Sequence, residues 1–188
     1  INTNGTDFVK IKCEKSYKLN KNYQNIINNL IINKPKNKNK IKEYFLKKDD
    51  FVTDILVKKI ILFLKQQKIN KKNIDLISIS GQTVYHDPSN KISIQLGNGK
   101  KIAKNLNIKT ISNLRDNDIK NGGQGAPIGS YYHKFLIQKF KENVVIVNLG
   151  GIANFSTIVS KTLISSDIGP ANCLIDDLSN HFFRKKFD

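Results

Sequence analysis

The sequence predicts an α/β protein in two parts, 1–142 and 143–188. Residues 51–68 carry apolar side chains at helical spacing, and the short apolar run 74–79 follows them as an α-then-β step. Beyond residue 142, apolar strands alternate with tight glycine turns and lead into a helix, as at the opening of a second domain. Because 39% of the 188 residues are hydrophobic, the chain has enough apolar material for a core.

In the first part, helices and strands are expected to alternate. The pattern predicts a strand over 6–17, a helix over 22–33 and a lysine-rich loop over 34–42. Asp49 or Asp50 can cap the helix that begins at residue 51. The remaining expected elements are a strand at 74–79, an alternating strand at 92–96 ending in a turn at 97–99, a helix at 100–106, a strand at 108–112, a glycine-rich loop at 121–127 and a helix at 128–140.

The second part is expected to hold three strands and one helix. The strands cover 144–147, 152–159 and 162–166, and the helix runs over 171–183. The fixed φ of Pro170 suits a first helical turn.

A net charge of +17 suggests nucleic-acid binding, but the residue types that produce the charge argue against it. The chain has 30 Lys but 2 Arg, together with 28 Ile and 24 Asn, residues that share A/T-rich codons. Nucleic-acid binders usually use Arg and interleave aromatic residues with basic ones. A nucleotide bias therefore explains the charge better than a nucleic-acid-binding module. The segment 34–42 is expected to be a solvated loop, with polyanion binding as the alternative.

Several classes of protein are excluded by simple features. The longest apolar run, 60–64, is too short to cross a membrane. Cys13 and Cys173 lie far apart, which excludes a disulfide scaffold and suits a cytoplasmic setting. The three histidines, at positions 86, 133 and 181, have no ligand spacing, so no metal site is expected.

Two loops of the second part suggest phosphate and proton chemistry. In 148–154, Gly150 and Gly151 can expose successive backbone N–H groups to a phosphate, although an ordinary hairpin turn explains them as well. Asp167 follows a strand and precedes a helix start, where helix N–H groups would keep it ionised as a general base. A plain helix cap is the alternative.

Two further loops suit a sugar. Gln82 and Thr83 follow an apolar strand, as does the glycine-rich loop 121–127, and their side chains can donate and accept hydrogen bonds. Ordinary loop chemistry is the alternative.

Five segments occur in one order: GQTVYHDP, QLGNG, LRDNDIKNGGQGAP, VNLGGIANFS and SDIGPANCLIDD. Together, over about residues 74–178, they resemble the bacterial anhydro-N-acetylmuramic acid kinase family. The resemblance implies an actin-like, ribonuclease H-like ATPase fold, with 1–142 as the sugar-side domain and 143–188 as the start of the second domain. It also implies opening of the 1,6-anhydro ring with phosphorylation of O6, ATP and Mg²⁺ as cofactors, and a cytoplasmic role in cell-wall recycling.

The resemblance also implies roles for individual residues. Asp167 would be the general base acting on the attacking water, with Asp118 as the next candidate. The phosphate-binding hairpin would use Asn148, Gly150, Gly151 and Asn154. The sugar side would use Gln82, Thr83, Arg115, Asp118, Gly123 and Gln124. The helix start beside the base would be formed by Gly169, Pro170 and Asn172.

The sequence departs from the family in several places. Ser80 stands where the family has His, Asn113 where it has Asp, Ser166 where it has Phe, and Ala171 where it has Gly. The family's first phosphate loop and its adenosine site have no counterpart, and the chain has no Met. We therefore expect an internal piece of a kinase, with a non-catalytic remnant as the alternative. A homodimer is left open.

Overall fold

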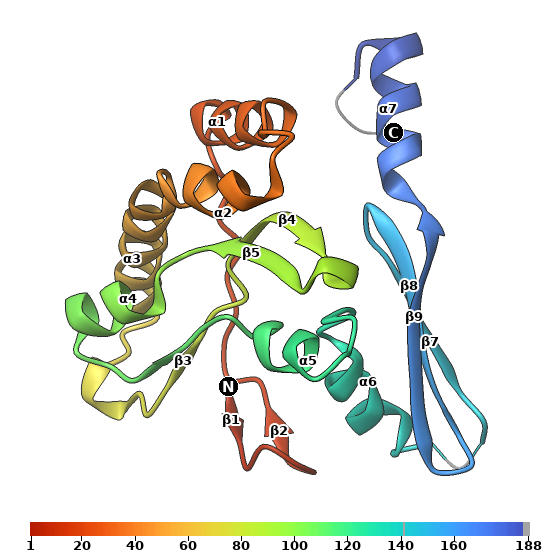
Figure 1. Cartoon of the computed structure of the whole chain (residues 1–188). Helices are drawn as coiled ribbons and strands as arrows, with labels where there is room; N and C mark the ends of the chain where they lie inside the picture. Colours follow the sequence, from red (N-terminus) through yellow and green to blue (C-terminus); the bar gives the residue numbers. More distant parts are fainter. Residues whose placement is uncertain (141, 186–188) are drawn as a thin grey trace. The chain divides into compact units, whose positions relative to one another are not determined.

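The computed structural model describes residues 1–140 and 142–185 (Figure 1). Its contacts divide the chain into two compact units. Unit 1 comprises Lys10–Gly125 with Ile1, and unit 2 comprises Asn2–Val9 with the chain from Ala126 onward. The sequence pattern placed the division at 142–143 instead, because it did not show that the helix before residue 140 packs on the strands after it.

Unit 1 contains five α-helices among its described residues: α1 (Lys21–Ile32), α2 (Lys38–Leu46), α3 (Asp49–Gln66), α4 (Gly99–Leu106) and α5 (Asp116–Lys120). The helices expected over 22–33, 51–68 and 100–106 are confirmed to within two residues. Helix α5 was not predicted.

Helix α2 corrects the expected loop at 34–42. Asn37 caps the helix by accepting the Asn39 N–H, and Ile41 and Phe45 are buried one helical turn apart. The burial of these two side chains outweighs the lysines that surround them.

Four short strands belong to unit 1. Strands β3 (Ile77–Ser78) and β6 (Thr110–Ile111) pair in parallel, and both are shorter than expected. Strand β4 (Gln82–Asp87), which was not predicted, pairs antiparallel with β5 (Ile92–Leu96). The strand expected over 6–17 is wrong for most of its length, because only β2 (Val9–Lys10) finds a partner, β1 (Asn2–Thr3).

The core of unit 1 forms where α1, α2 and α3 pack on the β4–β5 hairpin. Its buried residues are Tyr23, Ile27, Leu30, Ile41, Phe45, Val52, Val84, Ile94 and Leu96. A second cluster joins α4 to α3 and to the β3–β6 pair through Ile102, Leu106 and Ile108. Leu56 of α3 contacts both clusters, so this helix links them.

Unit 2 is a three-stranded antiparallel sheet with helices α6 (Ser130–Ile137) and α7 (Asn172–Phe183). The strands β7 (Val145–Leu149), β8 (Ile152–Val159) and β9 (Thr162–Pro170) pair in chain order. The bounds predicted for β8 are confirmed. Strand β9 continues past Ser166 because Ile152 at the start of β8 pairs with Pro170.

This continuation corrects one expected feature. Gly169 and Pro170 end a strand and do not begin a helix, whereas Asn172 begins α7, one residue after the expected start at 171. The mixture of helices and strands agrees with the predicted α/β class. Within 1–140 and 142–185, every helix is too short or too polar to span a membrane.

Candidate active site

Three polar residues form a row across the sheet of unit 2. The β7–β8 register pairs Asn148 with Asn154, and the β8–β9 register pairs Asn154 with Asp167. Paired residues in an antiparallel sheet point to the same face, with Cβ atoms about 5 Å apart. Two side-chain amides and an exposed carboxylate therefore lie side by side on one face.

A β-bulge lies next to this row. Asn154 pairs with Asp167 but Ala153 pairs with Gly169, so Ile168 is an extra residue on β9. The bulge brings Gly169 level with the end of the β7–β8 hairpin.

The hairpin turn at Gly150 and Gly151 holds the start of α7. The Ala171 N–H donates to the Gly151 carbonyl at 2.9 Å, and the Asn172 N–H donates to the Gly150 carbonyl at 3.0 Å. The Asn172 side-chain Nδ2 donates to the Leu149 carbonyl at 3.0 Å. The expectation that helix N–H groups support Asp167 is therefore wrong for these two amides, because the turn accepts them.

The glycines of this region are not required by packing. A Cβ atom on Gly150 would come no closer than 3.4 Å to another atom, and one on Gly151 no closer than 3.8 Å. A Cβ atom on Gly169 would meet nothing within 4 Å. Gly169 thus leaves open space beside the backbone, whereas a methyl group at Gly150 or Gly151 would fit in ordinary van der Waals contact.

The same face of the sheet is covered at its other end by α6. His133 Nδ1 lies 2.8 Å from the Ser156 hydroxyl, and Ser156 is fully buried. Ser156 lies two residues along β8 from Asn154, so it shares the face of the polar row. Helix α6 therefore packs beside the row while Asp167 stays exposed.

In unit 1, the glycine-rich loop is held by α5. The Gly125 N–H donates to Asp118 Oδ2 at 2.6 Å, and the Gly123 N–H donates to the Asp118 carbonyl at 2.8 Å. Arg115 Nη1 donates to the Gly125 carbonyl at 2.6 Å. The structure thus brings together four expected sugar-side residues: Arg115, Asp118, Gly123 and Gln124.

Here glycine is required by the fold. A Cβ atom on Gly123 would collide with the Asp118 carboxylate. Gly125 has a φ of +66°, and a Cβ atom there would lie 2.8 Å from the Ile119 side chain.

Gln82 and Thr83 lie in strand β4 and not in the expected loop. Gln82 pairs with Leu96, and Thr83 pairs with Gln95. The Tyr23 hydroxyl donates to Gln82 Oε1 at 3.2 Å, so a residue of α1 holds this side chain.

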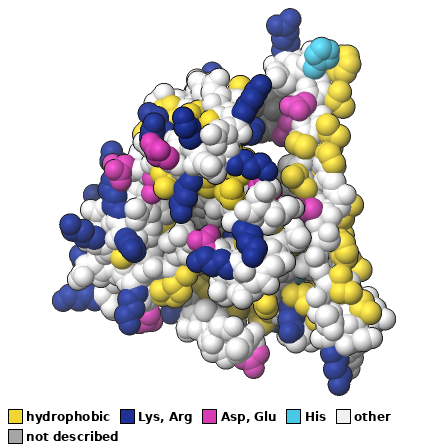
Figure 2. Space-filling view, in the orientation of Figure 1, with side chains coloured by type: hydrophobic (Ala, Val, Ile, Leu, Met, Phe, Trp, Pro, Cys, Tyr) yellow, Lys and Arg dark blue, Asp and Glu magenta, His cyan; other side chains and the backbone are white. Residues whose placement is uncertain are grey.

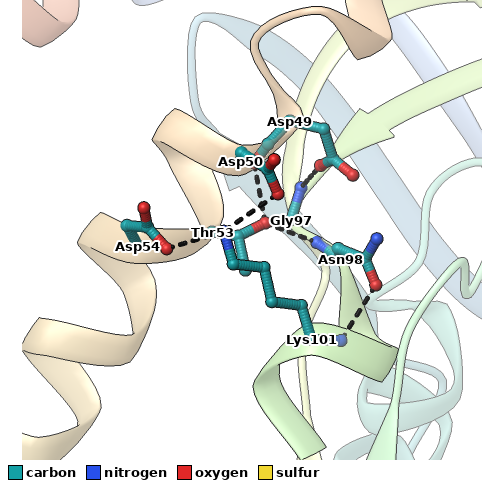
Figure 3. A network of polar contacts seen from close by, with 7 residues as sticks. All are labelled: Asp49, Asp50, Thr53, Asp54, Gly97, Asn98 and Lys101. Carbon is teal, nitrogen blue, oxygen red and sulfur yellow. Dashed lines mark hydrogen bonds and ion pairs between the residues drawn. The ribbon is translucent and has the colours of Figure 1, made fainter. Parts of the chain in front are cut away.

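The first turn of α3 fixes the segment that follows β5 (Figure 3). The Asp49 carboxylate accepts the Gly97 N–H at 2.7 Å. The buried Thr53 hydroxyl accepts the Asn98 N–H at 2.8 Å and donates to the Asp49 carbonyl at 2.7 Å. The expectation that Asp49 or Asp50 caps the helix is wrong, because both lie in its first turn and the N-cap position is Lys48, without a side-chain cap.

Beside this network, Lys101 of α4 forms ion pairs with Asp50 and Asp54 of α3, both at 2.9 Å (Figure 3). The hydrogen bond from Lys101 to Asp54, and to a smaller extent the one to Asp50, raises the pKa of Lys101 above its ordinary value. Asp50 and Asp54 are exposed, so these pairs contribute little to stability.

A separate pocket of about 430 Å³ in unit 1 gathers positive charge. Its charged lining residues are Lys38 and Lys42 of α2, Lys91 and Lys120, together with Asp116. Lys38 also lies 3.5 Å from Asp87. On the face shown in Figure 2, Lys and Arg side chains are scattered and do not merge into one stripe.

The chain is similar to a known family over almost its whole length. The family model for anhydro-N-acetylmuramic acid kinase matches residues 5–188. An anhydro-N-acetylmuramic acid kinase of Pelagibacter ubique is 35% identical over 178 residues, which cover 88% of this chain and 46% of the relative. Kinases of the same name from Bradyrhizobium diazoefficiens and Legionella pneumophila are 34% and 42% identical, over 73% and 60% of this chain and 38% and 32% of the relatives.

This chain therefore spans about half or less of the length of these curated relatives. The family match covers both the polar row of unit 2 and the glycine-rich loop of unit 1. On these grounds, the chain belongs to the anhydro-N-acetylmuramic acid kinase family.

Proposed function

We propose that the protein containing this chain is a kinase that opens the 1,6-anhydro ring of anhydro-N-acetylmuramic acid and phosphorylates O6. The product would be N-acetylmuramic acid 6-phosphate, formed during cell-wall recycling in the cytoplasm. The names of the relatives support the substrate. The observation that carries the proposal is the row formed by Asn148, Asn154 and Asp167.

The row suits a reaction at two neighbouring atoms. Water attacks C1, the C1–O6 bond breaks, and O6 receives the phosphoryl group. Asp167 takes a proton from the water, while the β7–β8 hairpin holds the phosphate end of the nucleotide. Asn148 and Asp167 are separated by two strand spacings, about 10 Å, which leaves room for a sugar and a water between base and phosphate.

The residues of the hairpin fit a nucleotide phosphate. Gly150 and Gly151 carry no side chain over the hairpin backbone, Gly169 has open space beside it, and Asn148 and Asn154 supply amide donors. ATP would supply the phosphoryl group that O6 accepts. Within the described residues, no cluster of three or more acidic, His or Cys side chains could hold a metal. Mg²⁺ would therefore bind mainly through the phosphates.

Unit 1 would supply the sugar side, through Gln82 and Thr83 and the loop held by Arg115 and Asp118. Since the Asp118 carboxylate already accepts the Gly125 N–H, its role in this proposal is to shape the loop. Asp167 accordingly remains the base. The two units would correspond to parts of the two lobes of an actin-like ATPase fold.

The proposal is tested with the chain extended by the remaining residues of the Pelagibacter ubique relative. This protein is incubated with Mg-ATP and the anhydro sugar in ¹⁸O-labelled water. We expect the product to carry one phosphoryl group on O6 and the ¹⁸O label at C1. Phosphorylation without label at C1, or no turnover by a folded protein that binds both substrates, would contradict the proposal.

A further inference from the structure

We propose that Tyr23 is a positioning residue that fixes the side-chain amide of Gln82 so that its Nε2 group donates a hydrogen bond to an oxygen of the sugar. The inference rests on the proposed function, which places Gln82 on the sugar side. It adds a residue from a helix that carries none of the family's motifs.

Tyr23 and Gln82 are joined by a side-chain hydrogen bond. The Tyr23 hydroxyl donates to Gln82 Oε1 at 3.2 Å. A protonated phenol offers one hydrogen, which the amide oxygen can accept and the amide nitrogen cannot. The Thr83 carbonyl can only accept a hydrogen bond and lies 3.3 Å from Nε2, so Oε1 faces Tyr23, and the Tyr23 hydroxyl holds the amide in this orientation by donating to Oε1. Burial raises the pKa of Tyr23, so the hydroxyl stays protonated at neutral pH.

The Gln82 side-chain amide has two N–H groups, and a protein acceptor is given for one of them. One N–H of Gln82 Nε2 donates to the Thr83 carbonyl at 3.3 Å. Among residues 1–140 and 142–185, the structure gives the other N–H no protein acceptor. Gln82 is half-buried, so this N–H remains within reach of a ligand. The ligand group that matches it is an acceptor such as a carbonyl, ether or carboxylate oxygen.

The Tyr23 ring is fixed by packing. Its ring stacks on Phe51 of α3 with centroids 6.0 Å apart, and its exposed fraction is 6%. The backbone of Gln82 is held without the Tyr23 hydroxyl, because Gln82 pairs with Leu96 of β5. The residues after Leu96, Gly97 and Asn98, are in turn fixed by Asp49 and Thr53. Loss of the Tyr23 hydroxyl would thus free the amide to rotate without moving the strand.

The test titrates anhydro-N-acetylmuramic acid into the 188-residue chain and follows the Gln82 side-chain amide by NMR. In Tyr23→Phe we expect about 5-fold weaker sugar binding, the usual worth of one hydrogen bond, with unchanged thermal unfolding. Gln82→Ala should weaken binding at least as much. The double variant should bind no more weakly than Gln82→Ala alone, because Tyr23 acts through Gln82.

Tyr85→Phe is the matched control. The Tyr85 hydroxyl donates to Asp87 at 3.3 Å and its ring packs near Phe45, so this variant removes a comparable hydroxyl without touching Gln82. Wild-type affinity in Tyr23→Phe, or additive losses in the double variant, would overturn the inference while the proposed function stands. A wild-type chain whose Gln82 amide does not respond to the sugar would overturn the proposed sugar side and the inference together.

Discussion

Unit 1 and unit 2 differ in how they treat their large hydrophobic side chains. Unit 1 buries both hydrophobic clusters, with Phe45 and Leu96 at 0% exposure. In unit 2, one face of the sheet exposes Val145, Val147 and Leu149, the last at 65%. Along α7, Leu174, Ile175, Leu178, Phe182 and Phe183 are exposed as well. In Figure 2, hydrophobic side chains follow the edge of the view where Figure 1 draws α7 and the β7–β9 sheet.

The difference means that the proposed sugar-side residues of unit 1 and the proposed base of unit 2 are supported unequally within their own units. Gln82 and Thr83 lie on a strand of the closed core, whereas Asp167 and the hairpin belong to a sheet with one uncovered apolar face. Regions with few buried apolar contacts open locally at low free-energy cost. We therefore expect the base and the phosphate hairpin of unit 2 to be less stable than strand β4 of unit 1 in this chain.

The largest expected effect distinguishes the roles of Asp167 in unit 2 and Asp118 in unit 1. In the extended protein, Asp167→Asn keeps the size of the side chain but removes the base. Ring opening should fall by about 10²–10⁴-fold, the usual contribution of a general base, with little change in ATP affinity. Asp118→Asn is the matched variant in unit 1 and should change sugar KM more than kcat. A larger loss of kcat in Asp118→Asn would place the base in unit 1.

The second prediction compares the two hydrophobic surfaces. Phe45→Ala empties a fully buried site and should lower the free energy of unfolding of unit 1 by about 3–5 kcal/mol. Leu149→Ala removes an exposed side chain and should change stability by less than about 0.5 kcal/mol. Urea denaturation with hydrogen exchange, read separately for each unit, measures both. Equal losses would show that Leu149 is covered in solution.

The third prediction compares glycines. Gly123→Ala places a Cβ atom against the Asp118 carboxylate and should destabilise unit 1 by about 1–3 kcal/mol. Gly151→Ala should leave thermal unfolding within about 0.5 kcal/mol of wild type, because the fold has room for the methyl group. Calorimetric titration of the extended protein should nevertheless show weaker Mg-ATP binding in Gly151→Ala. Unchanged ATP binding would argue against phosphate binding by the hairpin.

The smallest expected effect concerns the ion pairs at the edge of unit 1. Asp54 and Asp50 raise the pKa of Lys101 above 10.5, so the stability that they add is present below that pH and is lost as pH rises through the raised value. Asp54→Asn should return the pKa of Lys101 toward 10.5, with little change in unfolding at neutral pH. An NMR titration of Lys101 Cε measures this shift. A large loss of stability at neutral pH would show that unit 1 depends on more than its core.

Where the apolar residues of the sequence have a strong periodicity, it was sufficient to predict the helices and strands. The bounds of β8 and the positions of α1, α3 and α4 follow from the spacing of their apolar residues. It was insufficient where composition hid the pattern. Lysines masked Ile41 and Phe45 in α2, and the mixed polarity of Gln82–Asp87 hid β4, whose stability comes from pairing with β5.

The candidate site was predicted as a set of loops but not as an arrangement. Motif order placed Asp167 near a phosphate turn, whereas its register against Asn154 depends on a bulge that no spacing rule indicates. The hydrogen bond from Gly97 to Asp49 joins residues 48 positions apart, and the bond from Tyr23 to Gln82 joins residues 59 apart. Such contacts depend on how helices pack, which local patterns do not determine.

The bulge at Ile168 also affects how this region tolerates changes in length. Asp167 is placed by its pairing with β8, while α7 is placed by the hydrogen bonds from Ala171 and Asn172 to the glycine turn. Ile168, the unpaired residue of the bulge, lies between these two attachments. Its deletion would draw the start of α7 back by about 3.3 Å, one strand residue, and leave the carboxylate where it is. Insertions and deletions acquired here during evolution would therefore change the helix before they changed the base.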